Sequence, residues 1–126
     1  MPNVYTNHKA KLANNSLTTI YTVPSTKTAI IKSVRVANDD VDNDCNITVT
    51  LVNTGSVIYM LEKDRTIQAK RSQELLATGN MAQDSADSSV AGPTPLIAKE
   101  SEIIKAQAEN ANDFSIIISV LEISDV

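Results

Sequence analysis

Residues 46–51 read NITVTL, a run in which apolar side chains alternate strictly with polar ones. A period of two places all the apolar side chains on one face of a β-strand, so the segment predicts a strand with one buried face. Threonine, valine and isoleucine recur along the whole chain, and branching at Cβ suits these residues to a pleated sheet. The pattern predicts an all-β protein.

Other strands are predicted between turn signals, at residues 17–23, 29–37, 57–62, 66–69, 73–76, 102–108 and 114–123. In residues 29–37, one face carries Ile30, Val34 and Val36 with Lys32 between them. The turn NTGS offers Gly55 for a positive φ angle. A short helix over residues 73–77 is an alternative to the strand there. Residues 114–123, FSIIISVLEI, are nearly all apolar, which predicts burial on both faces at the centre of a sheet.

Together these strands predict a single-domain antiparallel β-sandwich of jelly-roll or immunoglobulin-like type. The expected core consists of apolar residues on three strands, namely Ile47, Val49, Leu51, Ile104, Ile116, Ile118 and Val120. We expect residues 17–126 to form the sandwich domain. Residues 1–16 are either an N-terminal arm, with Val4 and Tyr5 contacting a neighbouring subunit, or an ordinary first strand.

Residues 78–95 predict one long polar loop, because they hold glycine, serine, aspartate and proline without any apolar period. Met81 and Val90 are among its few apolar residues. We expect them to contact a neighbouring subunit when the protein assembles.

Composition argues against several classes of partner. Eleven basic residues are scattered among 15 acidic ones, for a net charge of −4, so we expect no nucleic-acid partner. The chain has no run of 18 apolar residues and no apolar stretch near its first residue. We therefore expect no membrane span and no signal peptide. A single cysteine, Cys45, cannot form an internal disulfide, which fits synthesis in a reducing cytoplasm.

The sequence contains few residues of the types that usually act in catalysis. His8 is the only histidine and lies in a polar stretch, where we expect a surface residue. Cys45, the only cysteine, is expected to be a small buried apolar residue rather than a nucleophile. The three glycines lie far apart, so no phosphate loop is present. The sequence predicts neither an enzyme nor a bound cofactor.

One acidic cluster, NDDVDND, resembles the start of a calcium loop, since Asp40, Asp42 and Asp44 have alternate spacing. The sixth loop position would be Cys45 instead of glycine, and the twelfth would be Leu51 instead of glutamate. A solvated turn, in which aspartates accept backbone hydrogen bonds, is the main expectation. A weak calcium site is the alternative.

The stretch KDRTIQAKRS holds the main concentration of basic residues, with Arg65, Lys70 and Arg71 among them. One interpretation is a solvated sheet edge that discourages unwanted strand pairing. The other is a contact for an acidic protein partner, because arginine forks bind carboxylates.

Four segments together resemble a family of small structural proteins of tailed-phage virions. They are IYTVPSTKTAIIKSVRVAN, NITVTLVN, YMLEKDRTIQAKRSQELL and PLIAKESEIIKAQAENANDFSIIISVLEIS. The resemblance covers residues 17–124 and departs at 78–95, where relatives tend to be shorter. It implies a β-sandwich located in a virion.

Three functions follow from this resemblance and from the composition. The first is a capsid decoration or cement protein that contacts the major capsid protein or other virion proteins, as a homo-oligomer. The second is a tail, neck or fibre component. The third is a carbohydrate-binding module, which the lack of tryptophan and the few tyrosines disfavour.

Overall fold

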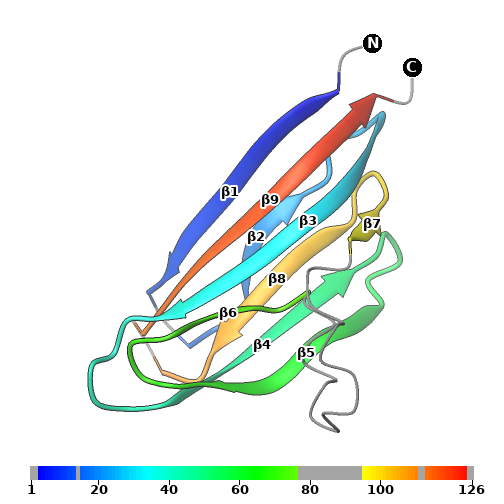
Figure 1. Ribbon diagram of the computed structural model, residues 1–126. Coiled ribbons are helices and arrows are strands. Elements are labelled where there is room, and N and C mark those ends of the chain that lie inside the picture. The colour runs from blue at the N-terminus through cyan, green and yellow to red at the C-terminus, as the bar shows by residue number, and fades with distance from the viewer. Residues whose placement is uncertain (1–2, 14, 77–94, 111–112, 125–126) are drawn as a thin grey trace, which may run out of the picture.

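The computed structural model describes residues 3–13, 15–76, 95–110 and 113–124. In these ranges the chain forms nine strands, arranged as two antiparallel sheets (Figure 1). No helix occurs in the same ranges, and hence none that is long and apolar enough to cross a membrane. The first strand begins, at Val4, at the same end of the sandwich where the last strand ends, at Ser124 (Figure 1).

The first sheet, called sheet A, has β9 and β3 at its centre. Its order is β1 (Val4–Leu12), β9 (Phe114–Ser124), β3 (Lys27–Asn38) and β6 (Ser72–Glu74), with β7 (Leu96–Ala98) also paired to β3. The second sheet, sheet B, has the order β2 (Thr18–Thr22), β8 (Ile103–Ala108), β4 (Cys45–Val52) and β5 (Ile58–Ile67).

The strand pairs are nested in the sequence. The innermost pair is β4 with β5, followed by β3 with β6 and β7, then β2 with β8, and finally β1 with β9. Going outward, the pairs alternate between sheet B and sheet A. This nested antiparallel arrangement in two sheets is the jelly roll. The fold is therefore an all-β sandwich, as predicted, and of the two types expected it is the jelly roll.

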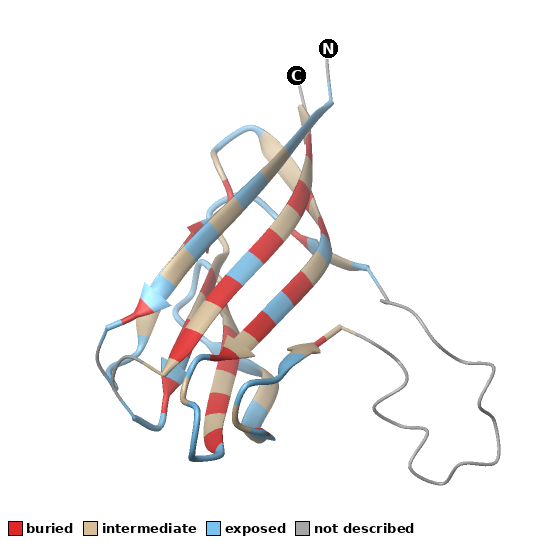
Figure 2. Cartoon of the chain, turned by 60° about the vertical axis from the view of Figure 1, so that its left-hand side comes forward, coloured by how far each residue is buried: buried red, intermediate tan, exposed pale blue. Residues whose placement is uncertain are grey.

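The core lies between the sheets and consists of the inward-facing residue of every second strand position, which gives the banded pattern of Figure 2. Six of the seven predicted core residues are buried, and Leu51 is half-buried and packs against the core. On β9 the buried positions are Phe114, Ile116, Ile118, Val120 and Glu122. The prediction that residues 114–123 are buried on both faces is wrong, because no layer in the described chain covers the outer face of sheet A.

A β-bulge changes the predicted faces of β3. Ile31 pairs with Val120, but the next pair along the ladder joins Ser33 to Ser119, so Lys32 is an extra residue. A bulge residue reverses the alternation beyond it. For this reason Ile31 and Val34 are both buried, whereas the simple period had placed Ile30 on the face of Val34.

Turns and short strands also differ from the sequence-based expectations. Residues 72–74 form a strand and not the alternative helix, and β7 was not predicted. In the β4–β5 turn, Ser56 adopts the positive φ of 64° that was expected for Gly55. The side chain of Asn53 holds this turn by accepting hydrogen bonds from the backbone of Gly55 and Val57.

The N-terminal strand lies on the chain's own sheet, where β1 pairs with β9 from Val4 to Leu12. The division into residues 1–16 and 17–126 stays a prediction. The loop predicted at residues 78–95 lies outside the described residues except for Pro95.

Candidate functional site

The outer face of sheet A carries an apolar row that crosses four strands. The ladders place Tyr5 beside Leu121, Leu121 beside Ile30, and Ile30 beside Ile97. Tyr5 and Ile97 are exposed by 74% and 60%, and the two residues between them are half-buried. Exposed apolar residues that lie together on a sheet face make that face a candidate for contact with another protein.

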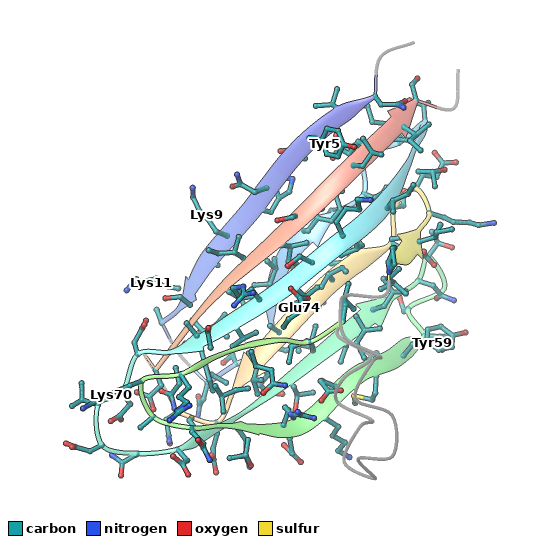
Figure 3. All side chains as sticks on the ribbon, viewed as in Figure 1. Tyr5, Lys9, Lys11, Tyr59, Lys70 and Glu74 are labelled. Carbon is teal, nitrogen blue, oxygen red and sulfur yellow. The ribbon has the colours of Figure 1, made fainter. Side chains whose placement is uncertain are left out.

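Basic side chains occupy the rest of this face. Lys9 pairs across Ile117 with Arg35, Lys11 lies two residues further along β1, and Lys32 is the extra residue of the bulge in β3. All four cations are exposed. Figure 3 shows Tyr5, Lys9 and Lys11 in succession along β1. We call the apolar row and these four cations together the sheet A face.

Shallow hollows lie between the strands of the sheet A face. One is lined by Tyr5, Asn7, Lys32 and Ser119 along with backbone neighbours, and another by Lys9, Lys11, Ser115 and Ile117. The sheet A face therefore places apolar hollows next to lysine side chains. Such a surface can bind both apolar and acidic groups of a partner.

Two carboxylates on this face are engaged within the chain. Glu74 accepts hydrogen bonds from the Ser33 hydroxyl and from the backbone N–H of Val34, the latter at 2.8 Å. Asp39 accepts a hydrogen bond from Ser115 at 2.7 Å and lies 3.6 Å from the Lys11 ammonium. Four cations against two carboxylates leave the face positive, although the whole chain carries a net charge of −4.

The predicted interface residues do not come together. Tyr5 lies near one end of the sandwich, at the start of β1, and Lys70 lies near the opposite end (Figure 3). Arg65 is half-buried on β5, where it pairs with Glu62 at 3.4 Å. Met81 and Val90 lie outside the described residues.

Of the residues on the sheet A face, sequence reasoning named Tyr5 but missed the four cations; Val4 pairs with Glu122 and lies on the other face of β1. Lys9 and Lys11 are two residues apart, which places them on one strand face and could have been noticed. Lys32 and Arg35 join them only because β9 lies between β1 and β3. A single sequence gives no signal for that arrangement.

The acidic cluster forms a turn. Asp40 accepts backbone hydrogen bonds from Asp42 and Asn43, which lower the pKa of its carboxyl group. Asp44 accepts another from Ala69 at 3.0 Å. Among the described residues, no group of three or more histidine, cysteine, aspartate or glutamate side chains could hold a metal ion. The calcium alternative therefore gains no support from the geometry.

His8 and Cys45 have different side-chain neighbours: His8 contacts Tyr21, and Cys45 accepts a hydrogen bond from Asn110. The His8 ring stacks against Tyr21, with centroids 4.4 Å apart, and its Nε2 atom is buried without a hydrogen-bond partner in the described part of the chain. The prediction of a surface histidine is wrong, because β1 alternation turns His8 toward the core. Cys45 is buried, and burial raises the pKa of its thiol.

A polar hollow on the outer face of sheet B is a candidate sugar site. It is lined by Asn15, Asn46, Thr48, Asp64, Gln107, Ala108 and Glu109. Several of these groups already bond one another: Gln107 donates to the Asn15 carbonyl and Asn46 N–H donates to Glu109. The lining has no aromatic ring on which a sugar could stack.

Comparison with known proteins gives matches only among solved structures. No protein-family model and no curated protein matches the sequence. One similar chain belongs to the acid-stable capsid structure of Helicobacter pylori bacteriophage KHP30. Its TM-score is 0.46 and its identity 18%, over 98% of this chain and 89% of that chain.

A second similar chain is a pentameric capsid protein from metagenomic phage sequences. It has a TM-score of 0.35 and 14% identity, over 97% of this chain and 59% of that one. A third belongs to the structure of infectious bursal disease virus strain Gt, with a TM-score of 0.38 and 6% identity, over 98% of this chain and 31% of that one. Two of these three come from phage capsids. This chain spans less than two thirds of the second and third chains.

Proposed function

We propose that this chain is a non-enzymatic structural protein of a phage virion, and that it acts as a capsid decoration or cement protein. The sequence pattern resembles small virion proteins of tailed phages. Jelly rolls occur in viral capsids as well as in lectins and cupins, so the fold alone does not choose between these functions. The choice depends on the surfaces of the molecule.

The observation that carries the proposal is the sheet A face. It presents an apolar row, which no layer of the described residues covers, next to four exposed cations, in a chain whose net charge is negative. Such a surface suits a protein partner that is apolar at its centre and acidic at its rim. We propose that this partner is the major capsid protein or another virion protein, because a cement protein acts by burying surface across the joints between subunits.

Charge reversal on two surfaces tests this assignment. The variant Lys9→Glu/Lys32→Glu changes the sheet A face, and Lys70→Glu/Arg71→Glu changes the basic turn predicted from the sequence by the same net charge. Each is added to phage particles that lack the protein, and the bound fraction is measured by co-sedimentation. We expect the first variant to bind at least roughly tenfold more weakly, because like charges then meet across the interface.

The turn variant should bind as the wild type does. If instead the turn variant loses binding and the sheet A variant keeps it, the contact lies at the turn and the assignment of the sheet A face is wrong. Failure of the wild-type protein to bind any particle would contradict the virion function itself.

A further inference from the structure

The edge strand β5 exposes apolar side chains that the core does not use. It lies at one edge of sheet B, opposite the edge formed by β2. Val57, which directly precedes β5, is followed by Ile58, Tyr59 and Met60 of β5, and each of the four is about half exposed, between 49% and 54%. On an ordinary edge strand every second side chain turns inward. Four consecutive exposed apolar residues therefore indicate a surface that another molecule covers.

The next residues of β5 form a charge pattern that is complementary to itself. Residues 62–65 read EKDR. When two copies of this segment lie antiparallel about a two-fold axis between residues 63 and 64, Glu62, which lies 3.4 Å from Arg65 of its own chain, also stands opposite Arg65 of the second copy. Lys63 then stands opposite Asp64 of the second copy. Opposite charges that face each other across the axis attract, and a two-fold contact forms every such pair twice.

A β-bulge at Asp64 interrupts the ladder in the middle of the EKDR segment. Asp64 has a φ of 51°, and its backbone N–H donates to the Thr48 hydroxyl at 3.0 Å instead of continuing the ladder. The pairing jumps here from Ile47 with Arg65 to Val49 with Glu62. A bulge interrupts regular edge-to-edge pairing. Contact at the centre is therefore made by the exposed side chains of Lys63 and Asp64.

We propose that β5 is the surface through which two copies of this chain associate about a two-fold axis. The EKDR segments pair at the centre, and residues 57–60 of each copy pack beside the end of β5 of the other copy. Tyr59 lies on β5, away from Tyr5 and the lysines of β1 (Figure 3). The dimer therefore leaves the sheet A face open, and the inference does not depend on the virion function.

Two single charge reversals test the pairing of residues 63 and 64. Analytical ultracentrifugation of the wild type over a range of concentrations should show a monomer–dimer equilibrium. Lys63→Glu and Asp64→Lys should each raise the dimer dissociation constant by roughly tenfold or more, because each places like charges opposite each other twice. An equimolar mixture of the two variants should dimerise again. In the mixed dimer the introduced glutamate faces the introduced lysine, and the two native residues face each other.

A control separates pairing from a general charge effect. Lys99→Glu makes the same charge change at an exposed residue outside β5, and it should dimerise as the wild type does. Lysine tolerates the backbone of position 64, since Lys70 in this chain already has a φ of 65°, and circular dichroism checks that each variant is folded. A wild type that stays monomeric at every concentration, or a mixture that stays monomeric, would overturn the proposal.

Discussion

Glu122 is a carboxylate on the core face of β9, and two residues from other strands, Tyr21 and Lys27, contact it. Tyr21 donates a hydrogen bond to it at 2.7 Å, Lys27 lies 3.5 Å away, and the His8 ring stacks on Tyr21. A buried carboxylate is costly unless it is paired and hydrogen-bonded. These contacts explain how a charge is accommodated at the end of an otherwise apolar core.

The titration of Tyr21 gives a prediction for alkaline pH. Burial, together with the hydrogen bond to Glu122, raises the pKa of the Tyr21 phenol. In the unfolded chain this group ionises near its ordinary pKa of about 10. A pKa raised in the folded state contributes stability below that pH, and the contribution is lost as the pH rises further.

We therefore compare the free energy of unfolding of wild type and Tyr21→Phe between neutral pH and about pH 11. At neutral pH the variant should be less stable by about 1–3 kcal/mol, because Glu122 loses a hydrogen bond while buried. Above about pH 10 the wild type should lose stability faster, so that the two curves converge. Parallel curves over this range would contradict the buried Tyr21–Glu122 contact.

At the scale of single elements, sequence reasoning predicted what depends on alternation alone. The strands at residues 46–51 and 114–123 and the buried Ile116, Ile118 and Val120 follow from a period of two. Which residues of β3 face the core could not be predicted, because the bulge at Lys32 depends on the pairing with β9. The same holds for Tyr21 and Glu122, whose contact spans 101 residues of sequence.

Deletion of β1 tests how much this single strand contributes to the stability of the sandwich. The strand pairs with β9 along its whole length, and its last residue, Leu12, is 1% exposed. Deleting residues 1–12 should lower the free energy of unfolding by about 3 kcal/mol or more, since burial of one leucine alone contributes roughly 1.5–3 kcal/mol. Chemical denaturation measures the change, with deletion of residues 1–3 as the control. A truncated protein that unfolds at the wild-type midpoint would show that β1 is a detachable arm.

The whole molecule presents different surfaces in different directions. Sheet A turns its apolar row and cations outward, the β5 edge presents apolar residues and a self-complementary charge pattern, and the acidic turn lies at the end of β3. Sequence reasoning expected a protein interface but placed its cations at the basic turn. The cations of the sheet A face come from β1 and β3, and only the strand order brings them together.

The central claim is that this chain is a structural component of a virion, present in many copies on the shell. Quantitative mass spectrometry of purified phage particles, with the major capsid protein as internal reference, measures its copy number directly. We predict hundreds of copies per particle, as expected for a decoration protein. A few copies to some tens would place the chain in the tail, neck or fibre and contradict the decoration role. Its absence from purified particles would contradict the virion function.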